Sequence, residues 1–74
     1  MTSDYAVVLV PSTNHAMRLE KLLRQADIPC KMIPVPRHIS SDCGACIRIL
    51  RQDMDAVHRV VAAAHIDIEG IQAI

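Results

Sequence analysis

The order in which short apolar runs and helix-like segments follow one another restricts the fold of this chain most strongly. Apolar, β-branched runs predict strands at residues 5–10, 30–33, 46–50 and 70–74. Residues 12–14 offer N-cap side chains, and apolar residues then recur at helical spacing, so a first helix is expected to stop near Asp27. Asp53 is expected to cap a second helix with an apolar stripe over residues 57–64.

This order predicts an α+β fold of the ferredoxin-like βαββαβ type. We expect a four-stranded antiparallel sheet in the order 4-1-3-2, with two helices on one face, and residues 1–74 forming a single domain. On the first strand, residues 5, 7 and 9 are expected to face the core. Ala6, Val8 and Val10 are then expected to form an apolar outer face, which favours a dimer or a partner.

Composition excludes several classes of function. The 74 residues include 8 Lys and Arg and 8 Asp and Glu, and Tyr5 is the single aromatic residue. Nucleic-acid binding is disfavoured because the chain has no excess of basic residues and no set of aromatic side chains on which bases stack. No stretch reaches the roughly 20 apolar residues of a membrane span. Residues 1–4 lack the basic start of a signal peptide, so we expect a cytoplasmic protein.

The segment from Pro34 to Cys46 has the strongest chemical signal. Pro34 and Pro36 restrict the backbone and remove hydrogen-bond donors, which predicts an exposed loop. Cys43 and Cys46 follow at C-x-x-C spacing, and an exposed thiol near the cationic Arg37 ionises readily to the reactive thiolate. In a reducing compartment, three cysteines favour reactive, carrier or metal-binding thiols. A structural turn with two small buried cysteines is the simpler alternative.

In the predicted fold, the turn after the first strand and the loop after the second strand lie at the same end of the sheet. The residues then expected around one shallow pocket are Ser12, Thr13, His15, Arg37, His38 and Cys43. Backbone N–H groups at a helix start suit an anion such as a persulfide, sulfide, selenide or phosphate, and histidine suits proton transfer. An ordinary capped helix also explains Ser12 and Thr13. Cys30 is expected at the opposite end of the sheet.

Several stretches together resemble the selenium/sulfur carrier protein-like family, a small bacterial and archaeal family. The matching stretches are Ser12-Thr13, His15-Ala16, Glu20-Lys21-Leu22-Leu23, Ile28-Pro29 and, most specifically, P-V-P-R at 34–37 with I-S-S-D-C-G at 39–44. The resemblance covers about residues 8–48 and implies a protein that handles sulfur or selenium with Cys43 as its thiol. The chain departs from the family pattern at His38, where an acidic residue is expected, and at Cys46, where cysteine is often absent.

The resemblance implies a carrier and not an enzyme. The Cys43 thiolate would take the terminal sulfur or selenium of a donor persulfide or perselenide, and Arg37 would hold the anion. Cys46 would act as a resolving thiol that releases the atom. The expected partners are a donor enzyme of the cysteine desulfurase or selenocysteine lyase type and an acceptor protein, with a homodimer as a further prediction. No cofactor is expected beyond the covalently carried sulfur or selenium.

Two other classes of function stay open. Cys43 and Cys46 suit a soft metal such as Cu(I) or zinc, although ferredoxin-like metal carriers place this motif after the first strand. Zinc would need further ligands, such as His15, His38 or a second chain. The third class is a structural or interaction domain that dimerises through the apolar outer face of the sheet.

Overall fold

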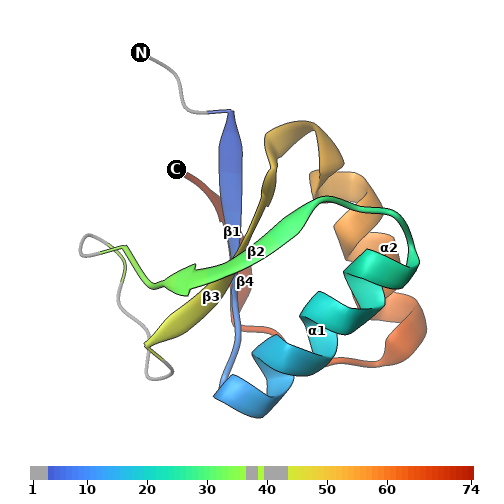
Figure 1. Ribbon diagram of the computed structural model, residues 1–74, viewed down its shortest axis with the longest axis horizontal. Helices are drawn as coiled ribbons and strands as arrows, with labels where there is room; N and C mark the ends of the chain where they lie inside the picture. The colour runs from blue at the N-terminus through green and yellow to red at the C-terminus, as the bar shows by residue number, and fades with distance from the viewer. Residues whose placement is uncertain (1–3, 37–38, 40–43) are drawn as a thin grey trace.

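The computed structural model describes residues 4–36, 39 and 44–74 (Figure 1). The elements in chain order are β1 (Tyr5–Leu9), α1 (Thr13–Gln25), β2 (Cys30–Pro34), β3 (Ala45–Leu50), a 3₁₀ turn (Arg51–Asp53), α2 (Met54–Ala64) and β4 (Gly70–Ala73). The four strands and two helices confirm the predicted α+β class. Each predicted strand is found within one residue of its expected ends.

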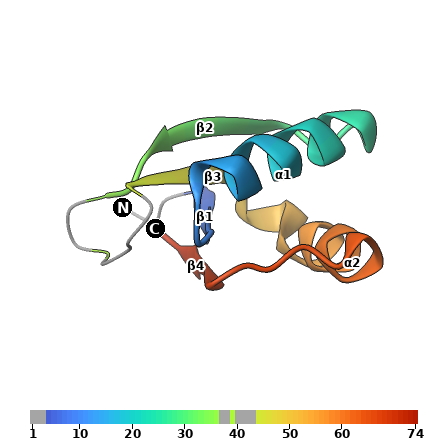
Figure 2. The ribbon, with the colours of Figure 1, turned by 90° about the horizontal axis from the view of Figure 1, so that it is seen from below.

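The four strands form one antiparallel sheet in the order β2-β3-β1-β4. Read from β4, the strands run 4-1-3-2, which is the order expected from the sequence. Both helices lie on the same side of this sheet (Figures 1 and 2). Among residues 4–36, 39 and 44–74, no helix lies against the opposite face of the sheet, and Val35 and Ile39 of the β2–β3 connection pack there.

Helix α1 begins and ends where local side chains favour it. Ser12 is the N-cap, and its side chain accepts a hydrogen bond from the backbone N–H of His15. The buried positions of the helix are Ala16, Leu19 and Leu23, which form one stripe. Ala26 is the C-cap, and Asp27 takes a left-handed φ of 59°. The predicted stop near Asp27 is therefore confirmed.

Helix α2 begins after the 3₁₀ turn, with Asp53 at its N-cap position. The Asp53 side chain makes no capping hydrogen bond, so only the position of the predicted cap is confirmed. The turn supplies the geometric reason, because Asp53 has a near-helical backbone and not the extended backbone of an effective cap. Val57 and Val61 are buried, and His65 ends the helix in a left-handed conformation.

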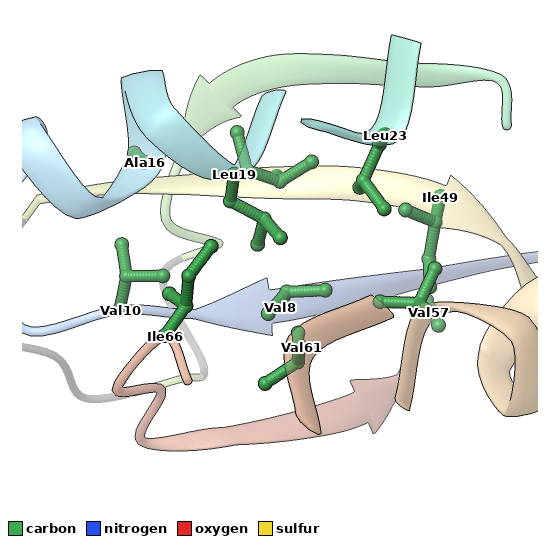
Figure 3. Close-up of a cluster of buried hydrophobic side chains, with 11 residues drawn as sticks. Val8, Val10, Ala16, Leu19, Leu23, Ile49, Val57, Val61 and Ile66 are labelled. Carbon is green, nitrogen blue, oxygen red and sulfur yellow. The ribbon is translucent and has the colours of Figure 1, made fainter. Parts of the chain in front are cut away.

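The main core lies between the two helices and the sheet. It contains Ala6, Val8 and Val10 of the β1 segment, Ile47 and Ile49 of β3, the buried stripes of both helices, and Ile66. Val8 lies between Leu19 of α1 and Val61 of α2 (Figure 3). Because no aromatic side chain takes part, the core is built from interdigitating aliphatic residues alone.

The predicted facing of β1 is wrong. Ala6, Val8 and Val10 face the helices and are fully buried, whereas Val7 and Leu9 point to the other face. The alternation fixes which residues share a face, but it does not identify the face when both sets are apolar. The apolar outer face expected from Ala6, Val8 and Val10 is therefore core, and it gives no support to the predicted dimer.

Val7 and Leu9 are also buried, in a second, smaller cluster. This cluster contains Val7, Leu9, Ile39 and Cys46, with Ile33, Val35 and Ile74 packed against it. Its side chains come from the strands and from the β2–β3 connection. Both faces of the sheet are thus apolar along residues 6–9 of β1, which explains why this strand lacks a polar face.

Candidate functional site

The β1–α1 turn and the β2–β3 connection lie at the same end of the sheet, as predicted. At this end Cys46 of β3 is paired with both Leu9 of β1 and Ile33 of β2. Leu9 ends β1, and Ile33 is followed only by Pro34 in β2, so both connections leave the sheet here. We call this the loop end of the sheet, and we call the other end the far end.

Ser12 and His15 are joined at the start of α1. The backbone N–H of His15 donates to Oγ of Ser12 at 3.3 Å, and the same oxygen is hydrogen-bonded to Nδ1 of His15. This leaves Nε2 as the ring nitrogen of His15 that Ser12 does not occupy. The first turn of α1 carries no acidic side chain, so no local carboxylate offsets the positive end of the helix dipole.

The described part of the β2–β3 connection packs on the face opposite the helices. Val35 N–H donates to the carbonyl of Gly44 at 3.1 Å, which ties the two ends of the connection together. Gly44 adopts a φ of +77°, a conformation that favours glycine at this position. Ile39 N–H donates to the carbonyl of Pro36 at 3.0 Å, and the Ile39 side chain is buried.

The Cys46 thiol is buried at the loop end of the sheet. Cys46 is fully buried and shares the second cluster with Val7, Leu9 and Ile39. Its S–H donates to the carbonyl of Pro34 at 3.9 Å. Cys46 is therefore a covered thiol at the loop end, in a setting unlike that of an exposed nucleophile. The burial of Ile39 was not predicted from the sequence, although an isoleucine among the polar residues at 37–42 was a usable signal.

Three predicted site residues, Arg37, His38 and Cys43, lie outside the described residues. Their expected position around a pocket with Ser12, Thr13 and His15 stays a prediction. The structure brings Ser12, Thr13 and His15 together at the loop end, on the side of the sheet that carries the helices. Thr13 is exposed, and Ser12 and His15 are half-buried.

Cys30 is at the far end of the sheet, as predicted. It is paired with Ile49 of β3, and its S–H donates to the carbonyl of Glu20 at 3.7 Å. Burial and the charge of Glu20 raise the pKa of the Cys30 thiol, and Arg24 only partly opposes this shift. Cys30 is therefore held as a neutral thiol, away from the loop end.

Among residues 4–36, 39 and 44–74, no group of three or more His, Cys, Asp and Glu side chains is arranged to hold a metal ion. Cys43, which the metal hypothesis needs, and His38, one of the further zinc ligands named above, are not in these ranges.

Within the same described ranges, no helix has the length and apolar character needed to cross a membrane.

Comparison with known proteins gives one match. A family model described as "Putative Se/S carrier protein-like" matches residues 4–72, which is nearly the whole chain. Searches of curated proteins and of solved structures give no match. The family match extends on both sides of the stretch 8–48 that carried the resemblance, and it includes the second helix and most of β4.

Proposed function

The chain belongs to the Se/S carrier protein-like family, and we propose from this membership that it carries sulfur or selenium, bound covalently to Cys43, from a donor enzyme to an acceptor protein. The family match over residues 4–72 is the observation that carries the proposal. In this proposal the chain is a non-enzymatic, cytoplasmic carrier with a ferredoxin-like fold. The atom is its cargo, so it needs no resident cofactor.

Loading is a thiol exchange at sulfur. The Cys43 thiolate attacks the terminal sulfur of a donor persulfide, R–S–SH, so that the donor S–S bond breaks and a new S–S bond forms. The products are Cys43–S–SH and the donor thiolate, and no net oxidation occurs. The same exchange with a perselenide places selenium on Cys43. A donor of the cysteine desulfurase or selenocysteine lyase type supplies such a group.

The loop end of the sheet has features that suit the bound anion. The start of α1 presents the positive end of its dipole without a nearby acidic side chain in its first turn. Nδ1 of His15 is engaged by Ser12, which leaves Nε2 to exchange a proton. In the proposal, Thr13 lines the same end, and Arg37 and His38 add positive charge beside the terminal sulfur.

Release uses Cys46 as the resolving thiol. Its thiolate attacks Sγ of Cys43 in the persulfide Cys43–S–SH. The S–S bond of the persulfide breaks, hydrosulfide leaves, and a Cys43–Cys46 disulfide forms. The carried sulfur is reduced to sulfide and the two cysteines are oxidised. A low-molecular-weight thiol then reduces the disulfide. Because Cys46 is fully buried in the cluster that also holds Ile39, this step requires the cluster to open, and we expect release to be slower than loading.

Intact mass spectrometry after incubation with a cysteine desulfurase and cysteine tests the proposal. The unaltered protein is expected to gain the mass of one sulfur atom, and Cys43→Ser to gain none. Cys46→Ser is expected to load normally and to release slowly. Cys30→Ser is the matched control, because Cys30 lies at the far end, and it should behave like the unaltered protein.

The metal hypothesis predicts a different pattern in the same variants. If Cys43 and Cys46 were both ligands, each substitution would weaken Cu(I) or zinc binding to a similar extent. Tight stoichiometric metal binding, together with equal loss of sulfur loading in the two variants, would overturn the carrier proposal.

A further inference from the structure

A hollow lies at the far end of the sheet, away from the proposed sulfur site. It has a volume of about 300 Å³ and is bordered by Tyr5 of β1, Lys31 of β2 and Arg48 of β3, with Cys30 and Leu50 at its edge. A water molecule takes about 30 Å³ in the liquid. The hollow therefore has room for a small ion with part of its hydration shell.

Two cationic residues, Lys31 and Arg48, border this hollow. Lys31 and Arg48 are direct partners in the antiparallel pairing of β2 and β3, so their side chains leave the same face of the sheet. Like charges placed directly opposite each other destabilise a sheet. A pair of this kind is favourable when an anion lies between the two side chains.

Arg48 is held in an orientation that suits an anion. Its guanidinium carbon lies 4.3 Å from the centroid of the Tyr5 ring. A cation–π contact of this kind does not use the hydrogen-bonding capacity of the guanidinium N–H groups, which can donate in pairs to an anion. Within the described residues, neither Arg48 nor Lys31 forms an ion pair with a carboxylate.

The lining of the hollow contains no negative charge. None of the residues that border it is acidic. Cys30 and Tyr5 are the lining residues whose ionisation would add a negative charge, and the S–H of Cys30 is directed to the carbonyl of Glu20. Its raised pKa keeps the thiol neutral. The hollow is thus a local positive site on a chain with no net charge.

We propose that this hollow binds a divalent oxyanion of the phosphate type. Arg48 donates two N–H groups from the edge of its guanidinium, Lys31 supplies the second positive charge, and the Tyr5 ring holds Arg48 in place. The site uses no residue of the loop end, so it is independent of sulfur loading on Cys43.

The test is a titration of the full chain with inorganic phosphate at pH 8 and constant ionic strength. The readout is the amide chemical shifts measured by NMR. Saturable shifts are expected at Tyr5, Lys31 and Arg48. Arg48→Gln is expected to weaken binding by about tenfold or more, and Lys31→Gln by about fivefold. Lys21→Gln removes an exposed cation on α1 and should leave the affinity unchanged. Acetate, a monovalent anion, should bind more weakly than phosphate.

Arg48→Lys is the second variant, since it keeps the charge and removes the paired N–H groups. It should fold like the unaltered protein and bind phosphate more weakly. Non-saturating shifts, or equal weakening by Lys21→Gln and Arg48→Gln, would show charge screening only and overturn the proposal.

A parallel titration with glycerol 1-phosphate separates two sources of the anion. Stronger binding of the ester identifies a phosphate group on a larger molecule, and stronger binding of inorganic phosphate identifies a free ion.

Discussion

The two faces of the sheet differ in what covers them. One face is packed against α1 and α2 and forms the main aliphatic core. Within the described part of the chain no helix lies on the other face. At its loop end Val7, Leu9, Ile39 and Cys46 form a second buried cluster, and at its far end Lys31 and Arg48 border a hollow. A chain of 74 residues has little surface to bury, and the larger of its two buried clusters lies on the helix-covered face.

This division leaves the second face available for chemistry. Its loop-end half contains Cys46, which is at the same end of the sheet as the start of α1. Its far-end half contains Arg48 over the Tyr5 ring. Cys46 and the Tyr5–Arg48 pair therefore share one face at opposite ends of the sheet, whereas Ser12, Thr13 and His15 lie on the helix side of the loop end. Substitutions on the two faces are expected to have effects of different kinds.

The largest effect is expected on the helix-covered face. Leu19→Ala removes a fully buried side chain from the main core and should lower the free energy of unfolding by about 3 kcal/mol. Met17→Ala is the matched control, because Met17 is 59% exposed on the same helix, and it should change stability little. Urea unfolding followed by circular dichroism measures both. Equal effects of the two variants would contradict the assigned facing of α1.

A smaller effect is expected for Ile39 on the second face. Ile39→Ala should cost about 1–2 kcal/mol, because a loop side chain leaves a space that its surroundings can partly fill. The result that distinguishes this variant is the rate of thiol alkylation. In Ile39→Ala, Cys46 should be alkylated faster than in the unaltered protein, whereas the rate for Cys30 should be unchanged. Alkylation time courses read by peptide mass spectrometry distinguish the two thiols. No acceleration at Cys46 would mean that Ile39 does not shield it.

The far end offers a change that should stabilise the protein. Lys31→Glu replaces a like-charged pair with an opposite-charged pair across β2 and β3, for an expected gain of about 0.5 kcal/mol in phosphate-free buffer. The gain should shrink at high salt. Lys21→Glu on α1 is the control for the change in net charge alone. A loss of stability in Lys31→Glu that exceeds the control would exclude repulsion between Lys31 and Arg48.

The smallest effect concerns pH and Cys30. Burial and Glu20 raise the pKa of this thiol in the folded chain, so the unfolded chain loses the proton first as the pH rises. The free energy of unfolding is then expected to fall in the alkaline range, above the ordinary thiol pKa, and to be unaffected below it. Cys30→Ala removes this contribution of the thiol to the pH dependence of the free energy of unfolding. Urea unfolding of both proteins at neutral and alkaline pH should show a difference that changes with pH, and a constant difference would contradict the shift.

The sequence was sufficient for the elements and their order. The Ser12 cap, the prolines and the regular apolar spacing located the two helices, and the predicted pairing placed Cys30 and the loop end correctly. The sequence did not determine which side of β1 faces the helices. Residues 6–10 are all apolar, so the alternation does not distinguish the core-facing residues from those on the other face. Only packing against both helices decides that Val8 faces the core.

The candidate site was predictable only in part. The N-cap role of Ser12 follows from its residue type and position. The burial of Cys46 and the position of Arg48 over the Tyr5 ring depend on strand register and on the packing of Val35 and Ile39 against the sheet. These are long-range consequences of the fold, which a local pattern does not specify.

The central claim is that one thiol carries the atom and a second, covered thiol releases it. The most direct test is the rate of hydrosulfide release from protein loaded with one sulfur atom, in excess low-molecular-weight thiol, for the unaltered chain, Cys46→Ser and Ile39→Ala. The account predicts slower release from Cys46→Ser and faster release from Ile39→Ala, because the latter exposes Cys46. Identical release rates in all three proteins would contradict it.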